Sequence, residues 1–177
     1  AEQIFREMKI GLDISLFKLG SCYPDMPFSM PDMPHIKHIS FERIMEMAGS
    51  LISDFGLLRY RYHLRRFSWN LGIIMHYISD FFCYVHNDPH FLSCLWHYAY
   101  ENKLFRDFLM LKEQNIHNIF RNTKGIRRTI TIDYLPIYLS IMHKEYLKGH
   151  YSTYKDIDYS LNMCLVTAFS ILNSCRK

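Results

Sequence analysis

Apolar side chains recur at helical spacing between residues 41 and 55. The positions that share one face there are Ile44, Met47, Ala48, Leu51, Ile52 and Phe55. This spacing predicts an amphipathic helix, with Ser40 as its candidate N-cap and Gly56 as its stop. The segment ahead of it, GSCYPDMPFSMPDMPHIKH (20–38), holds four prolines. It is expected to be a long loop, because closely spaced prolines prevent regular structure.

Two longer helices are expected in the middle of the chain. One should run from about Leu58 to Val85, and the next from about His90 to Phe120. The sequence Asn87-Asp88-Pro89 stands between them. It should end the first of these helices, because a residue before proline resists the α region.

A further helix is predicted after a connection over residues 122–128. Asp133 is its candidate cap, and Pro136 falls in the first turn, where proline is tolerated. The helix should continue to about Lys148, and Gly149 should end it.

The last segment, DYSLNMCLVTAFSILNSC (158–175), predicts a core helix capped near Asp156 or Asp158. Its apolar residues in register are Leu161, Leu165, Ala168, Phe169 and Leu172. Only TITI (129–132) suggests a strand, and it is too short to build a sheet. We therefore predict an all-α fold, a single-domain helical bundle over residues 1–177.

Composition is consistent with one globular domain and excludes a disordered chain. The 177 residues are 49% hydrophobic and 16% aromatic, enough to bury a sizeable core. The net charge of +4 comes from scattered basic residues without a continuous polybasic face. Binding to nucleic acid or to an anionic surface is therefore permitted but not indicated.

The cysteines and the hydropathy of the chain indicate in which cellular compartment the protein is expected. The five cysteines form no CxxC pair and no even framework, which favours reduced, buried thiols and a reducing compartment; they are Cys22, Cys83, Cys94, Cys164 and Cys175. No apolar stretch reaches the roughly 18 residues that a membrane span needs. The start, AEQIFREMKI, is charged, unlike a signal peptide. We expect a cytoplasmic protein, or a secreted one if a signal precedes Ala1.

Polar residues at ligand spacing interrupt the apolar run of residues 71–91. His76 and Asp80 are four apart, so on a helix they share one face and can converge on one ion. His86, on a continued helix, would be rotated by roughly 120° from Asp80 and would suit a second ion nearby. His97 and Glu101, again four apart, would complete that second site with nitrogen and oxygen ligands of the kind zinc prefers.

A single histidine at helical spacing is more often a core residue than a metal ligand. Here two pairs flank His86 among aromatic and aliphatic residues that exclude water, and this joint pattern favours a metal centre. The other histidines have no partner at ligand spacing and are interpreted as surface or core residues; they are His63, His90, His117, His143 and His150.

The motif HYISDFFCYVH (H-x3-D-x5-H), followed by H-x3-E, resembles the zinc-dependent phospholipase C family of bacteria. The spacing agrees at all five ligands, and the resemblance covers chiefly residues 20–101. It implies the all-helical fold shared by phospholipase C and P1 nuclease, and a cluster of three zinc ions that polarises a phosphodiester.

The same resemblance implies two further ligands from an earlier loop. Asp25 and His35 fit this role best, with Asp32 and His38 as competitors. Asp25 would also orient or deprotonate the attacking water, as the catalytic residue. One ion would then be held by Asp25, His35, His76 and Asp80, and a second by His86, His97 and Glu101, with Asp80 bridging toward a third.

The third ion of the family is completed by the amino terminus and an early histidine. This chain begins with Ala1, where the family has Trp, and has no histidine before His35. We therefore expect two tightly bound zinc ions in this chain, unless upstream residues supply the missing ligands.

The expected function is that of a metal-dependent phosphodiester hydrolase, foremost a phospholipase C that contacts a membrane surface transiently. A P1- or S1-type nuclease, or a phosphatase, on the same scaffold is the first alternative. It is less similar, because Glu101 follows His86 by only fifteen residues, and no specific nucleic acid is expected. The second alternative is a non-catalytic helical interaction protein that binds metal. Aromatic residues near the motif could face a lipid headgroup or form plain core; they are Tyr77, Phe81, Tyr84 and Tyr100.

Overall fold

The computed structural model describes residues 11–53, 57, 60–88, 94–111 and 130–174. Every regular element in these ranges is helical, which confirms the predicted all-α fold class. The α-helices are α2 (Ile14–Cys22), α3 (Lys37–Ser53), α4 (Arg61–Phe81), α5 (Cys94–Leu109), α7 (Leu135–Tyr146) and α8 (Thr153–Ser174), and the 3₁₀ turns are η1 (Tyr23–Asp25) and η3 (Tyr84–His86).

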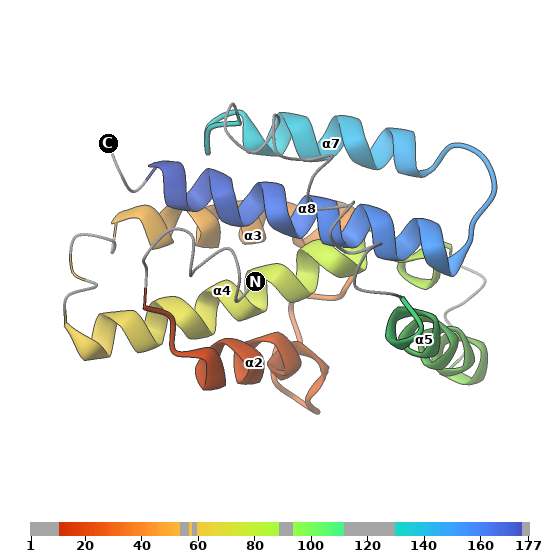
Figure 1. Cartoon of the computed structure of the whole chain (residues 1–177), viewed down its shortest axis with the longest axis horizontal. Helices are drawn as coiled ribbons and strands as arrows, with labels where there is room; N and C mark the ends of the chain where they lie inside the picture. The colour runs from red at the N-terminus through yellow and green to blue at the C-terminus, as the bar shows by residue number, and fades with distance from the viewer. Residues whose placement is uncertain (1–10, 54–56, 58–59, 89–93, 112–129, 175–177) are drawn as a thin grey trace.

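Helix α4 is the centre of the fold. It packs against α2, α3 and α8, and α8 also contacts α5 and α7 (Figure 1). The run Leu71–Met75 is buried without interruption, as expected for a helix covered on several sides. The side chains that α4 contributes to a site therefore stand on a helix packed against three others.

Glycines allow α2 to approach α4 closely. A methyl group on Gly20 would collide with the backbone carbonyl of Trp69, and one on Gly72 would collide with that of Phe17. The two helix backbones therefore lie in direct contact, and only glycine fits at these two positions.

We expect Gly72→Ala to destabilise the protein by about 1–3 kcal/mol, because α2 must move away from α4 to make room for the methyl group. Gly49→Ala is the matched control, since nothing lies within 4 Å of the added carbon and alanine favours the interior of α3 by about 1 kcal/mol. Urea unfolding of both variants measures this difference. Equal stabilities would contradict the close packing.

The predicted helix over 58–85 ends earlier than expected, at Phe81. Cys83 is extended, and the backbone N–H of Tyr84 donates to the Asp156 carboxylate at 2.9 Å. The Ser160 hydroxyl binds the carbonyl of Ser79 at 2.9 Å. These partners from α8 turn the chain, so His86 lies in η3 and not on the helix. The predicted rotation of His86 about the α4 axis is therefore wrong.

The other central boundaries also differ. Helix α3 begins at Lys37, so Ser40 is not its N-cap; Ser40 is buried inside the helix, and its hydroxyl donates to the Pro34 carbonyl. The helix predicted over 90–120 ends at Leu109. Residues 54–56, 90–93 and 112–128, with the Gly56 stop and the 122–128 connection, lie outside the described ranges.

The N-terminal helix α2 was not predicted. Asp13 caps it, with its carboxylate accepting a hydrogen bond from the backbone N–H of Leu16 at 3.1 Å. The predicted loop over 20–38 therefore begins with the last turn of this helix, and the 3₁₀ turn η1 follows directly.

In the C-terminal part, Pro136 lies in the first turn of α7 as predicted, but the cap is Tyr134 rather than Asp133. The helix ends at Tyr146, before Lys148, and Gly149 follows with a φ of 78°. The described residues of TITI form no strand.

Neither Asp156 nor Asp158 caps α8, because both lie inside the helix. Instead the Ser152 hydroxyl accepts a hydrogen bond from the backbone N–H of Lys155 at 3.2 Å. Asp156 is fully buried and therefore has another role.

Among the described residues, no helix is both long and apolar enough to cross a membrane. The thiols of Cys22, Cys83 and Cys164 are free. Cys83 is buried as predicted, whereas Cys22 is exposed.

Candidate metal centre

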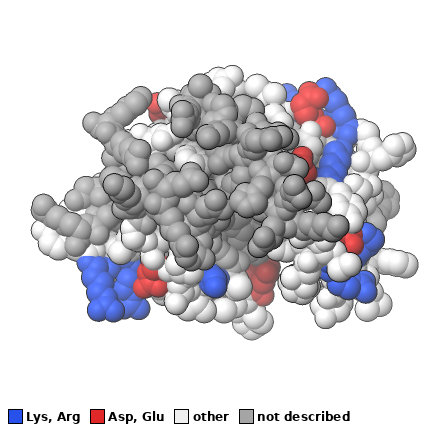
Figure 2. Space-filling view, in the orientation of Figure 1, with Lys and Arg blue, Asp and Glu red and all other residues white. Residues whose placement is uncertain are grey.

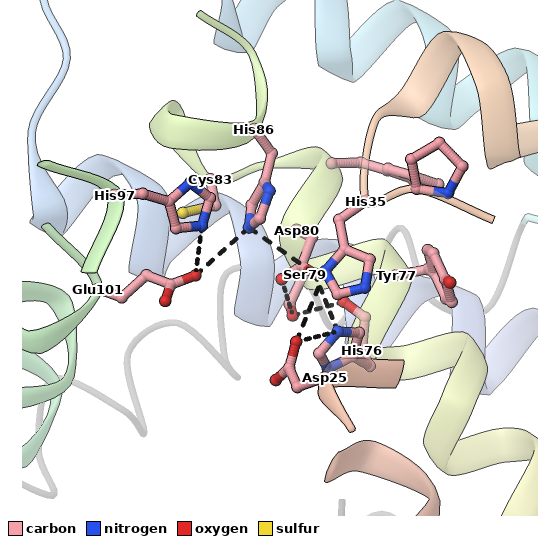
Figure 3. A network of polar contacts seen from close by, with 12 residues as sticks. Asp25, His35, His76, Tyr77, Ser79, Asp80, Cys83, His86, His97 and Glu101 are labelled. Carbon is pink, nitrogen blue, oxygen red and sulfur yellow. Dashed lines mark hydrogen bonds and ion pairs between the residues drawn. The ribbon is translucent and has the colours of Figure 1, made fainter. Parts of the chain in front are cut away.

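The structure brings all seven predicted ligand residues together (Figure 3). Four elements and one connecting segment supply them. Asp25 stands in η1, His35 in the segment before α3, His76 and Asp80 on α4, His86 in η3, and His97 and Glu101 on α5. Side chains that are 76 positions apart in the sequence therefore meet at one place.

The first set of donors surrounds one oxygen of Asp80. His35 Nδ1 and His76 Nε2 each lie 3.0 Å from Asp80 Oδ2. Asp25 Oδ1 lies 3.6 Å from His35 Nδ1 and 3.5 Å from His76 Nε2. His35 and His76 thus each lie near both carboxylates, and Asp25, His35 and His76 form one group of donor atoms within 4.8 Å of one another. These four residues are the set predicted for the first ion.

The second set lies beside the first. Glu101 Oε1 is 2.9 Å from His97 Nε2 and 3.6 Å from His86 Nε2. His86 Nε2 is also 3.9 Å from Asp80 Oδ2, so the 3₁₀ turn brings His86 close to Asp80. Asp80 therefore stands between the two sets, and His86 can serve either one.

These separations fit zinc. Tetrahedral donors at about 2.0–2.2 Å from zinc lie roughly 3.3–3.6 Å from one another, close to the distances of the first set. His76 Nε2 and Asp80 Oδ2 are buried, yet neither makes a hydrogen bond of normal geometry within the described part of the chain. Buried polar atoms normally have partners, and a metal ion bound between these donors would supply one.

Hydrogen bonds outside the donor sets orient His76 and the loop before α3. His76 Nδ1 lies 2.9 Å from the Ser21 carbonyl; the ring therefore donates there and turns its Nε2 lone pair toward the other donors. The close packing of α2 on α4 makes this contact possible. The buried Tyr77 hydroxyl donates to the Met33 carbonyl, which ties the segment carrying His35 to α4.

Charges in the cluster shift the pKa values of His76 and Asp80 in opposite directions. Burial lowers the pKa of His76, but the carboxylates of Asp80 and Asp25 outweigh this effect and raise it to about 9. Burial acts to raise the pKa of Asp80, yet the rings of His35 and His76 hold it well below its ordinary value. A cation bound here would take the place of the imidazole protons.

Asp156 anchors the segments that carry the second donor set, a role that the sequence analysis did not predict. Its carboxylate accepts hydrogen bonds from the hydroxyls of Tyr100 at 2.7 Å and Tyr146 at 2.8 Å, and from the backbone N–H of Tyr84 at 2.9 Å. Burial raises its pKa, and these hydrogen bonds oppose the rise. Asp156 thus joins η3 and α5, which carry the second donor set, to α8.

The remaining candidates lie elsewhere. Asp32 and His38 are exposed, and neither belongs to a donor group among the described residues. Of the four aromatic residues named near the motif in the sequence, Tyr77 and Phe81 are fully buried in the core.

The histidines outside the donor groups have other surroundings. The His143 ring is within 2.8 Å of Asn87 Oδ1, and burial together with the charge of Lys37 lowers its pKa to about 4. His90 and His117 lie outside the described residues.

Two hollows adjoin the donors. One, of about 300 Å³, lies between α5 and α8, and Asp80 and Glu101 reach its wall. The apolar part of its lining is Leu104, Phe105, Phe108, Ile157 and Leu161. The second, which we call the polar cleft, measures about 520 Å³ and has His86 and His97 in its wall. Its other polar residues are Lys37, His38, Asn87, Asp88 and His143.

Comparison with known proteins gives one match. A family model described as zinc-dependent phospholipase C matches residues 1–160. Searches of the curated proteins and of the solved structures return no match.

Proposed function

The chain belongs to the zinc-dependent phospholipase C family, and on this premise we propose that it is itself a phospholipase C. The family implies a zinc-dependent hydrolase, and the reaction would split a phospholipid into diacylglycerol and a phosphorylated headgroup. The observation that supports this proposal most is the convergence of seven donor residues in three overlapping groups, which share His35 and His86. Adjacent cation sites suit a phosphodiester, because each can bind a different oxygen of the same phosphate.

The first set would hold one zinc ion through Asp25, His35, His76 and Asp80. The second would hold another through His86, His97 and Glu101, with Asp80 between them. Bound zinc supplies positive charge that offsets the charge developing on the phosphate oxygens and lowers the pKa of a water toward about 7.

Asp25 is the proposed catalytic residue. Its side chain is 66% exposed, whereas those of His76 and Asp80 are 11% and 15% exposed. Water and substrate can therefore reach the Asp25 carboxylate, which would accept the proton of the attacking water. The P–O bond to glycerol breaks as the new P–O bond forms, and the glycerol oxygen takes up a proton.

The apolar hollow favours a lipid over a nucleic acid. It adjoins Asp80 and Glu101 and offers aliphatic and phenylalanine side chains, which suit the glycerol and acyl part of a phospholipid. On the described surface in Figure 2, Lys and Arg form separate groups, most of them beside Asp or Glu. A continuous basic groove, as single-strand nucleases need, is not seen on the described part of that face.

An assay panel tests the proposal directly. Zinc-loaded protein should hydrolyse phospholipids in mixed micelles and release phosphorylated headgroups, with little action on single-stranded DNA or RNA. Preferential cleavage of nucleic acid would favour the nuclease alternative. Bound zinc with no turnover of any phosphodiester would favour a non-catalytic metal-binding protein.

We expect Asp25→Asn to lower kcat by about 10²–10⁴-fold, because the amide cannot accept the proton of the water. Asp32→Asn, in the same proline-rich segment and exposed, should retain the parent rate. Steady-state hydrolysis of the preferred lipid measures both variants. The reverse result would identify Asp32 as the catalytic carboxylate.

The described donors are expected to bind about two zinc ions tightly, because three or four protein donors bind zinc far more strongly than one carboxylate does. His97→Ala should reduce the zinc content to about one ion, since only the second set loses a donor. Mass spectrometric metal analysis after gel filtration measures the stoichiometry. A His97→Ala variant that keeps both ions would remove His97 from the ligand set.

A further inference from the structure

The polar cleft extends from the second donor set. His86 and His97 stand in its wall, and it continues between the start of α3 and α7, where Lys37 and Leu147 line it. A phosphate held at the donor sets could therefore place its remaining substituent in this cleft. If the apolar hollow takes the acyl part of a phospholipid, the substituent in the polar cleft is the headgroup.

Lys37 is the cation in the described lining of this cleft whose charge has no carboxylate partner. Its ammonium group lies 4.3 Å from the centroid of the Phe41 ring, over its face. It is partly buried, and among the described residues no carboxylate forms an ion pair with it. Asp88 also lines the cleft; its carboxylate accepts a hydrogen bond from the Tyr84 hydroxyl at 2.8 Å and forms no ion pair with Lys37.

A second ammonium group, that of Lys144, lies near Lys37. The ammonium of Lys144 on α7 acts unfavourably on that of Lys37, and the exposed side chain of His38 also lines the cleft. A partly desolvated cation without a counter-charge is unfavourable. An anionic group entering the cleft relieves this penalty, whereas a quaternary ammonium headgroup adds to it.

We propose that the polar cleft binds the headgroup and that Lys37 selects lipids whose headgroup carries a second anionic group beyond the scissile phosphate. This proposal rests on the proposed phospholipase C function. The second anion could be a carboxylate, as in phosphatidylserine, or a phosphate, as in a phosphorylated phosphatidylinositol. Both would accept charge-assisted hydrogen bonds from the Lys37 ammonium.

Two pairs of lipids isolate the second anion. Phosphatidylserine differs from phosphatidylethanolamine by one carboxylate, and phosphatidylinositol 4-phosphate differs from phosphatidylinositol by one phosphate. We expect the zinc-loaded chain to have an about tenfold higher kcat/KM for the anionic member of at least one pair, the size of effect that about 1.4 kcal/mol gives. The pair that shows the preference identifies the anion.

Lys37→Met keeps the length of the side chain and removes the charge, so the preference within the pair should disappear. Lys37→Arg should retain most of it. Lys148→Met is the matched control, because Lys148 is exposed and pairs with Glu145 at 2.7 Å; its preference should equal that of the parent. Thermal unfolding shows whether each variant is folded, and the Lys37→Arg result tests the charge if Lys37→Met does not fold.

A binding measurement gives a readout without turnover. Calorimetry with the zinc-loaded protein should show phosphoserine binding more tightly than phosphoethanolamine, or inositol 1,4-bisphosphate more tightly than inositol 1-phosphate, with the difference lost in Lys37→Met. Turnover of all four lipids without a preference in either pair would overturn the role of Lys37. Turnover of none would instead overturn the proposed phospholipase C function.

Discussion

Asp80→Asn is expected to lose tightly bound zinc and to lower the proposed phosphodiesterase activity at least about a thousandfold. The Oδ2 atom of Asp80 lies 3.0 Å from His35 Nδ1 and from His76 Nε2, and 3.9 Å from His86 Nε2. It is the one described carboxylate that faces both donor sets. An amide of the same shape has no negative charge and binds zinc poorly, so the substitution should weaken the binding of both ions.

Zinc analysis after dialysis, together with lipid turnover, measures this effect. His76→Ala should act in the same direction, because its Nε2 is buried among the same donors. Both variants should also melt at a lower temperature than the parent in the presence of zinc, since bound metal stabilises only the folded state. His150→Ala, at an exposed position outside the donor groups, should match the parent. Full zinc occupancy and turnover in Asp80→Asn would show that the ligand assignment is wrong.

Asp156→Ala is expected to destabilise the protein by about 3–5 kcal/mol, because it leaves several buried donors unsatisfied at about 1–3 kcal/mol each. The substitution leaves the Tyr100 and Tyr146 hydroxyls and the Tyr84 backbone N–H without their acceptor. Each unsatisfied buried group is costly. The second donor set should also loosen, because η3 and α5 lose their common anchor on α8.

Denaturant unfolding of the metal-free protein measures the change in the free energy of unfolding separately from any change in metal binding. Asp158→Ala is the matched control, because Asp158 lies two positions away on α8 but is exposed; it should change the stability by less than about 0.5 kcal/mol. Similar losses in the two variants would contradict the anchoring role of Asp156.

The sequence predicts those parts of the centre that depend on one helix. His76 with Asp80, and His97 with Glu101, share a helical face because residues four apart do so. Their donor atoms lie 3.0 Å and 2.9 Å apart, as that spacing allows. The all-α class follows in the same way from apolar periodicity.

Features set by tertiary contacts could not be predicted in this way. The turn that brings His86 beside Asp80 exists because Asp156 and Ser160 on α8 bind the backbone after Phe81. In the sequence, Asp156 is interpreted as a candidate helix cap. Its actual role depends on three hydrogen-bond donors from other elements of the fold, which local spacing does not predict. The loop ligands Asp25 and His35 came from a family resemblance, because no periodicity relates them to α4.

Diffraction from crystals of the zinc-loaded chain, recorded at the zinc absorption edge, tests the central claim most directly. We predict two anomalous peaks, one within bonding distance of Asp25, His35, His76 and Asp80, and the other within bonding distance of His86, His97 and Glu101. Peaks at other residues, or no peak at all, would contradict the assignment of this cluster as a zinc centre. A third fully occupied peak would contradict the expected number of ions and add a ligand outside these seven residues.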